Sequence, residues 1–199
     1  GSLTADKAIA VTVTNVNEAP TVSAPATFSL TEDVTGNLQF SGSPFADVDG
    51  NSLTVTLSVA NGSINVASSS SITLGGTATS RTFAGSAANL NTYFTTAGNI
   101  TYSPASNVNG SRTLTTSVSD GYLSASATST INISAVADAP TASGSASIAA
   151  ISEDATASGN LISTLFSGNF SDTTDAVTGG SSAHTMAAIA IVLYSADAS

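Results

Sequence analysis

The sequence predicts an all-β protein built from tandem β-sandwich repeats, with one short helix in the complete repeat. Three observations lead to this prediction. β-Branched or apolar residues alternate with small polar ones in several short segments, which is the period of a half-buried strand. Asp-Gly and Asn-Gly pairs separate those segments and are typical of tight turns. The first 21 residues also resemble a later stretch of the chain, which indicates an internal repeat.

The alternation places the expected strands in order along the chain. They are residues 8–14, a strand of about ten residues between Pro20 and Glu32, and residues 53–59, 63–66, 100–102, 114–119 and 127–134. Turns are expected at Asp49-Gly50, Asn61-Gly62, Gly75-Gly76, Asn109-Gly110 and Asp120-Gly121. The helix is expected at residues 87–94, where Leu90 and Phe94 share a face. About seven strands in a unit of this size predict two packed sheets of an immunoglobulin-like Greek-key β-sandwich.

The internal repeat has a period of about 120 residues. Residues 1–21 align without a gap with residues 121–141, an offset of 120, and both stretches end in Ala-Pro-Thr. The likeness continues beyond the proline, where Glu32-Asp33 corresponds to Glu153-Asp154. The chain therefore divides into the last strand of a preceding repeat with its linker (1–18), one complete repeat (19–137) and the N-terminal part of a following, truncated repeat (138–199).

The composition excludes several classes of function. The 199 residues include 13 acidic and only 3 basic side chains, a net charge of -10, so the chain lacks the cationic surface that nucleic acid requires. The longest apolar run, residues 186–194, is too short for membrane insertion, which takes roughly 20 residues. A hydrophobic content of 41% predicts a folded chain. The absence of Cys removes disulfides and thiolate metal sites.

The acidic residues are expected at the two ends of the complete sandwich. A strand of about ten residues crosses the domain at roughly 3.3 Å per residue, so Glu32 lies at the opposite end from the turn at Asp49. The end that receives the first linker (the near end) gathers Asn15, Asn17, Glu18, Asp47, Asp49 and Asp120, and the end that leads into the second linker (the far end) gathers Glu32, Asp33, Asp138, Asp172 and Asp175.

Such clusters of carboxylates predict a bound cation. Closely packed carboxylates repel each other unless a cation lies between them or some of them take up protons. Ca²⁺ is the expected ion because it takes about six to eight oxygen ligands in flexible geometry. One His and no Cys leave little for a transition metal. A second interpretation stays open, in which Asp49-Gly50 and Asp120-Gly121 serve only as turn residues with solvated carboxylates.

Several short motifs recur in a fixed order. They are NVNEAP at 15–20, AVADAP at 135–140, the acids Glu32 and Glu153, DVDG at 47–50, and YSPASNVNG followed by SVSDG between residues 102 and 121. Together they resemble the cadherin-like tandem repeats of large bacterial surface adhesins, including RTX-type adhesins, over essentially the whole chain. The resemblance implies that an early-strand Glu, the linker, and the loop acids of the following repeat bind Ca²⁺ jointly. It also implies an extracellular or cell-surface protein, exported by type I secretion.

These observations predict a structural function without catalysis. The expected role is a calcium-stabilised spacer and adhesion repeat of a long extracellular protein, in which Ca²⁺ at the junctions rigidifies the array and the partners are neighbouring repeats. The alternative is a carbohydrate-binding or protein-binding module, homophilic pairing included, that uses the end loops of the sandwich. A groove lined with exposed aromatic residues would favour the alternative, and a surface covered with Ser and Thr would favour the spacer.

Overall fold

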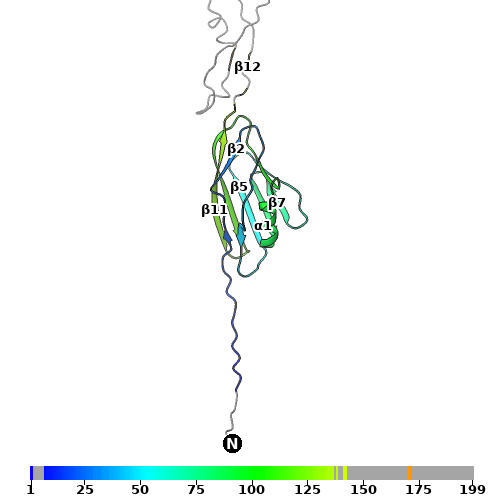
Figure 1. Cartoon of the computed structure of the whole chain (residues 1–199), viewed down its shortest axis with the longest axis vertical. Helices are drawn as coiled ribbons and strands as arrows, with labels where there is room; N and C mark the ends of the chain where they lie inside the picture. Colours follow the sequence, from blue (N-terminus) through cyan, green and yellow to red (C-terminus); the bar gives the residue numbers. More distant parts are fainter. Residues whose placement is uncertain (2–6, 137, 139–140, 143–169, 172–199) are drawn as a thin grey trace, which may run out of the picture.

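A computed structural model of the chain describes residue 1, residues 7–136, residue 138, residues 141–142 and residues 170–171. Within them the protein is all-β with one short helix (Figure 1). The elements are β1 (Thr21–Val22), β2 (Thr27–Thr31), β3 (Gly36–Asn37), β4 (Phe45–Ala46), β5 (Leu53–Val59), β6 (Ser63–Val66), β7 (Thr73–Thr77), β8 (Ser80–Gly85), α1 (Ala87–Thr95), β9 (Ile100–Ser103), β10 (Gly110–Ser119), β11 (Ser124–Ser134), β12 (Thr141–Ala142) and β13 (Phe170–Ser171).

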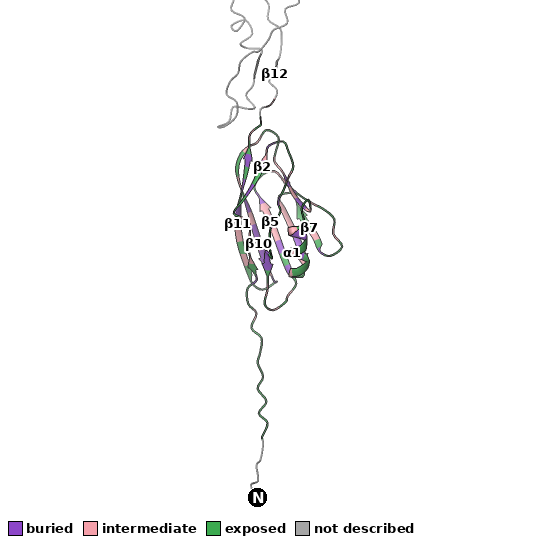
Figure 2. Ribbon diagram, viewed as in Figure 1, coloured by how far each residue is buried: buried purple, intermediate pink, exposed green. Residues whose placement is uncertain are grey.

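The complete repeat contains one large sheet and two small ones. The large sheet has the strand order β2-β11-β10-β5-β8-β7, and all its pairs are antiparallel except β2 with β11. A three-stranded sheet has the order β3-β9-β6, and β1 pairs with β4 alone. Burial alternates along β5, where Leu53, Val55, Leu57 and Val59 point inward. Figure 2 shows buried positions along the strands and an exposed N-terminal segment.

The helix α1 completes the core. It begins after Ser86, whose side-chain oxygen accepts a hydrogen bond from the Asn89 N–H at 3.3 Å and caps the helix. Phe94 of α1 packs edge-on against the rings of Phe40, Phe45 and Phe83, with centroids 5.1, 4.8 and 4.8 Å away. The rings therefore join α1 to β4 and β8.

The structure confirms much of the expected order of elements. The strands at 53–59 and 63–66 have the predicted bounds, and α1 ends one residue later than expected. The expected strand after Pro20 is wrong as a single strand, because β1 pairs with β4 whereas β2 pairs with β11. Pro25 lies between the two pieces and lacks the N–H that a continuous ladder needs.

The turn expected at Gly75-Gly76 is also wrong. Both glycines lie inside β7, and the turn to β8 comes at residues 78–79. Gly76 has a φ of +82°, and a Cβ there would collide with the carbonyl oxygen of Ser80 across the hairpin. Glycine is thus required here by the close approach of two strands and not by a turn.

Residues 8–14 do not form the expected strand. Their backbone joins no ladder, and Ile9, Val11 and Val13 are 83%, 80% and 87% exposed. The segment leads away from the sandwich as extended chain (Figure 1). A strand exists only with a partner for its N–H and C=O groups, and none of the described residues supplies one to this segment.

The pairing of β12 with β13 repeats that of β1 with β4. Thr21 pairs with Ala46 and Val22 with Phe45, while Thr141 pairs with Ser171 and Ala142 with Phe170. Residues that the internal repeat matches, such as Phe45 and Phe170, therefore adopt the same register.

Candidate functional site

The linker before β1 meets two loops of the sandwich at its near end. The side-chain amide of Asn15 donates to Oδ1 of Asp49 at 2.5 Å, and the backbone N–H of Glu18 donates to Oδ2 of Asp49 at 2.8 Å. The amide of Asn17 donates to Oδ2 of Asp120 at 2.7 Å. These contacts bring together the residues predicted for this end, the near-end cluster of Asn15, Asn17, Glu18, Asp47, Asp49 and Asp120.

The loop between β4 and β5 is held by its own first carboxylate. Oδ1 of Asp47 accepts from the N–H of Asp49 at 2.9 Å and from the N–H of Asn51 at 3.5 Å, an arrangement typical of an Asx turn. Gly50 has a φ of +70°, which favours glycine. Oδ2 of Asp47 is buried and has no hydrogen-bond partner among the described residues.

The turn between β10 and β11 fixes Asp120 in the same way. Oδ1 of Asp120 accepts from the N–H groups of Tyr122 and Leu123, both at 2.7 Å, and the residue is only 8% exposed. Oδ2 points to the linker, where Asn17 meets it. One oxygen of Asp47 and one of Asp120 therefore serve the loop itself, whereas both oxygens of Asp49, for which a turn role alone stayed open, contact the linker.

The electrostatics of the near-end cluster divide its acids into two kinds. The N–H of Glu18 and then the amide of Asn15 hold the pKa of Asp49 below its usual value. The N–H of Leu123 and then the amide of Asn17 lower the pKa of Asp120. The pKa of Glu18 is raised, first by loss of hydration and then by the negative charge of Asp49. Ionisation is thus favoured at Asp49 and Asp120, whereas at Glu18 it is disfavoured by loss of hydration and by the charge of Asp49.

The near-end cluster as it stands is not a formed metal centre. Across the part of the chain that the structure describes, no three His, Cys, Asp or Glu side chains converge as they would around a metal ion. The amide groups of Asn15 and Asn17 instead occupy one oxygen of Asp49 and one of Asp120.

At the far end, Glu32 holds the start of the second linker. It is only 1% exposed, and its Oε1 accepts from the N–H of Val136 at 2.6 Å while its Oε2 accepts from the amide of Asn109 at 3.0 Å. Oδ1 of Asp33 accepts from the N–H of Asn107 at 2.9 Å. Both Asp33 and Asn107 have left-handed backbones, with φ of 58° and 56°. The length of β11, roughly 33 Å at 3.3 Å per residue, separates the two ends.

Three predicted far-end acids lie in or beyond the second linker, and two amide side chains contact the sites without having been predicted to do so. Asp138 is half-buried, and Asp172 and Asp175 lie outside the described residues. The prediction missed Asn51 as a member of the near end, where its amide donates to Oδ1 of Asn17 at 3.0 Å. Asn109, which was expected only as a turn residue, contacts Glu32 at the far end. Each of these two amides is next to a glycine that was expected in a turn, which is the signal that could have identified them, although Gly110 begins β10.

Comparison with known proteins leaves the family open. No protein family and no curated protein matches the chain. Among solved structures, the endo-fucoidan hydrolase MfFcnA4 from glycoside hydrolase family 107 and a variant of it match 60% of this chain at 20% identity and a TM-score of 0.35. The match spans 14% of each of those chains. A likeness this small does not bear on function. Among the described residues, no helix has the length and apolarity to span a membrane.

Proposed function

We propose that the chain is a calcium-stabilised structural spacer and adhesion repeat of a long extracellular bacterial surface protein, without catalysis. The observation that carries the proposal is the attachment of the linker to two acidic loops. Asn15 and Glu18 contact Asp49, and Asn17 contacts Asp120, so the orientation of the linker depends on carboxylates.

The tandem arrangement that the spacer requires has independent support. The order of the strands, with β2 parallel to β11 and two sheets around one core, is compatible with an immunoglobulin-like or cadherin-like Greek-key sandwich. The shared register of β1 with β4 and of β12 with β13 supports a second unit of the same kind after the linker. By the offset of 120, residues 8–14 correspond to residues 128–134 of β11, so we assign them to the sandwich of a preceding repeat.

The near-end residues fit a hard divalent cation. The atoms that could ligate the ion are carboxylate and amide oxygens, which Ca²⁺ prefers. Loss of hydration and then the charge of Asp49 raise the pKa of Glu18, and the buried Oδ2 of Asp47 has no partner among the described residues. The side chains that would hold the ion are Asp47, Asp49, Asp120 and Glu18, with Asn15 and Asn17. Asn15 and Asn17 now donate to carboxylates, so binding would require their amide groups to turn and present oxygen instead.

The mechanism is mechanical. In a repeat array each unit contacts mainly its neighbours, so the linker decides between a stiff rod and a flexible chain. A bound ion would replace carboxylate repulsion at the near end with attraction and fix the linker against both loops. At the far end, Glu32 already fixes Val136, and we expect Asp33, Asp138, Asp172 and Asp175 to add ligands for a second ion.

Calcium titration followed by backbone amide NMR tests the site. We expect saturable shifts at residues 15–19, 47–51 and 120–122, and their loss in the Asp49→Asn variant. The matched control is Asp33→Asn, which removes an acid at the other end and should leave the near-end shifts intact. Absence of saturable near-end shifts, or their persistence in Asp49→Asn, would refute the site.

Small-angle scattering tests the mechanical role. Chelation should change the maximum dimension of the protein, because it frees the linkers while each sandwich stays folded. A maximum dimension that stays the same with and without a chelator would show that calcium does not stiffen the chain, even if calcium binds.

The end loops give less support to the alternative function. Tight recognition of a sugar or a partner by those loops calls for several exposed aromatic groups. In the described part of the chain, Tyr122 is the one strongly exposed aromatic residue, at 86%. The aromatic residues of the helix, Tyr93 and Phe94, are buried in the core. The spacer role is therefore the better-supported function.

A further inference from the structure

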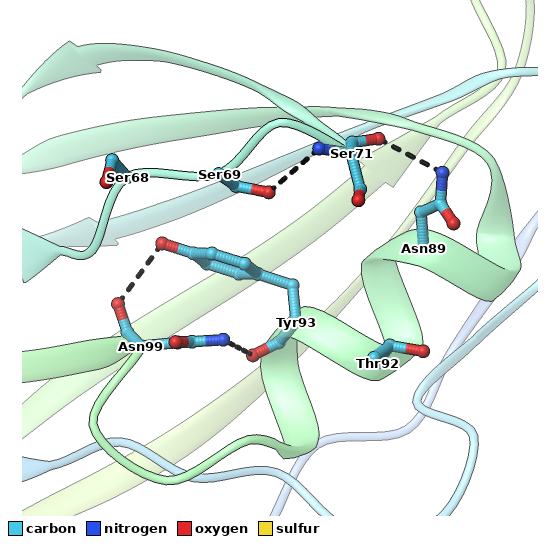
Figure 3. A pocket seen from close by; sticks show the side chains of 7 residues that line it. All are labelled: Ser68, Ser69, Ser71, Asn89, Thr92, Tyr93 and Asn99. Atoms are coloured by element: carbon cyan, nitrogen blue, oxygen red, sulfur yellow. Dashed lines mark hydrogen bonds between the residues drawn. The ribbon is translucent and has the colours of Figure 1, made fainter.

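A polar groove lies between α1 and the loop of residues 67–72 that joins β6 to β7 (Figure 3). It is a hollow of about 210 Å³, and a second hollow of about 290 Å³, which no residue of α1 lines, shares Ser71 with it. The smaller hollow corresponds to about seven water volumes, which is room for one small ring. None of the acidic residues at the two ends of the sandwich lines either hollow.

The groove carries no charge. The side chains around the smaller hollow are hydroxyls, amides and one phenol, from Ser68, Ser69, Ser71, Asn89, Thr92, Tyr93 and Asn99. Burial raises the pKa of Tyr93, so its hydroxyl stays neutral. A charged ligand would lose hydration here without gaining an opposite charge. The ligand class that fits is therefore uncharged.

Several groups in the groove are already fixed by hydrogen bonds (Figure 3). The amide of Asn89 donates to the carbonyl of Ser71 at 3.0 Å, and the N–H of Ser71 donates to Oγ of Ser69 at 3.1 Å. The amide of Asn99 donates to the carbonyl of Tyr93 at 3.1 Å. A ligand would thus meet polar groups whose positions are set before it arrives, which lowers the entropic cost of binding.

Other groups are left to interact with a ligand. The hydroxyls of Ser68 and Ser71 and the amide oxygens of Asn89 and Asn99 have no hydrogen bond to another described residue. Hydroxyls both donate and accept, whereas amide oxygens only accept. This mixture complements a ligand whose own groups both donate and accept, which is the property of a sugar hydroxyl.

We propose that this groove binds a short neutral oligosaccharide through hydrogen bonds. One sugar ring occupies the smaller hollow, and the next lies in the second hollow, which Ser71 also lines together with Ser52, Ser70 and Thr73. Tyr93 is only 6% exposed and bonds to the carbonyls of Ala67 and Asn99, so it offers no stacking face. Without stacking, binding is weak, in the millimolar range, and gains strength only when many repeats act together.

Sugar titration of the chain by amide NMR tests this proposal. The probes are glucose, galactose, mannose and N-acetylglucosamine, the disaccharides cellobiose, lactose and maltose, and glucuronate as the charged counterpart. We expect saturable shifts at residues 68–73, 89–92 and 99 with at least one neutral sugar. A disaccharide should bind more tightly than its monosaccharide, and glucuronate should bind no more tightly than glucose.

Variants distinguish sugar binding in the groove from nonspecific sugar binding elsewhere on the protein. Ser71→Ala and Asn89→Ala should each weaken binding about fivefold, the effect of losing one hydrogen bond. The matched controls are Ser126→Ala and Asn132→Ala on the exposed face of β11, which should leave binding unchanged. The dispersion of the amide spectrum reports whether each variant folds. If Asn89→Ala does not fold, Ser71→Ala alone tests the groove.

The outcome of the sugar titration is independent of the outcome of the calcium titration. Sugar binding should be unchanged by a chelator, since no acidic side chain lines the groove. No saturable shift with any neutral sugar up to about 100 mM would overturn the proposal. Equal binding by the groove variants and their controls, or tighter binding of glucuronate, would also overturn it.

Discussion

Asn17 joins the first linker to the last hairpin of the sandwich, since its amide nitrogen donates to Oδ2 of Asp120 at 2.7 Å across 103 positions of sequence. The oxygen of the same amide accepts from the amide of Asn51 at 3.0 Å. One side chain thus links the linker to both near-end loops. The residues just before β1 therefore belong to the end of the sandwich, while residues 8–14 extend beyond it.

Removal of this side chain should release the linker and leave the core intact. In Asn17→Ala we expect faster hydrogen exchange at residues 15–19, because both loop contacts are lost. Exchange at β5 and β10 should stay unchanged, since Asn17 contacts neither strand. Asn37→Ala, an exposed Asn on β3, is the matched control. Unchanged exchange at residues 15–19 would show that other contacts hold the linker.

A buried hydroxyl weakens the core at Thr116. This residue is 0% exposed on β10, and its Oγ1 has no hydrogen-bond partner among the described residues. Because an unpaired buried hydroxyl costs roughly 1 to 3 kcal/mol, Thr116→Val should raise the free energy of unfolding by about 1 kcal/mol. The measurement is urea denaturation. The control Thr113→Val, exposed on the same strand, should stay within about 0.5 kcal/mol, and a loss of stability in Thr116→Val would contradict the prediction.

The sequence was sufficient for features that depend on local pattern. β5 alternates apolar and Thr or Ser residues without interruption, so its period and bounds could be predicted from residues 53–59 alone. The near-end cluster was predictable because strand length determines at which end each acidic loop lies. Glu18 and Asp49 meet as expected, 31 positions apart in sequence.

Features that depend on contacts between distant segments could not be predicted in this way. Residues 8–14 have a strand pattern as clear as that of β5, yet pattern cannot reveal whether a partner is present. Gly76 resembles a turn residue, but its role is set by the carbonyl of Ser80 across the hairpin. The polar groove was equally hidden, because the loop at Ser71 meets Asn89 of α1 only in the folded chain.

Glu32 should control the start of the second linker. In Glu32→Ala, the N–H of Val136 and the amide of Asn109 lose their common acceptor, so hydrogen exchange at Val136 should increase. Glu32→Gln keeps one oxygen and should give an intermediate rate, because its amide nitrogen cannot accept. Near-end residues 15–19 serve as the internal reference. Equal rates at Val136 in all three proteins would mean that Glu32 does not hold the linker.

The opposite pKa shifts at the near end define how its stability depends on pH. Asp49 and Asp120 have pKa values below the usual 3.8, so they stabilise the fold above that pH and lose this effect as the pH falls through their lowered values. Glu18 has a pKa above the usual 4.5. Its contribution to the stability of the fold is therefore complete below that pH and is lost as the pH rises through its raised value. Without calcium, these three groups together favour folding most near pH 4.

Calcium should remove the upper limit of this pH range, because a cation favours ionised Glu18. We expect the melting temperature of the calcium-free protein to fall as the pH rises above 4.5, the usual pKa of Glu, and the gain from added calcium to grow over the same interval. Glu18→Gln does not titrate, so the calcium-free variant should lose the part of this fall that Glu18 causes. The measurement is a series of thermal melts from pH 3.5 to 7.5 with calcium or chelator. A calcium effect that stays constant across this range would show that Glu18 is not a ligand.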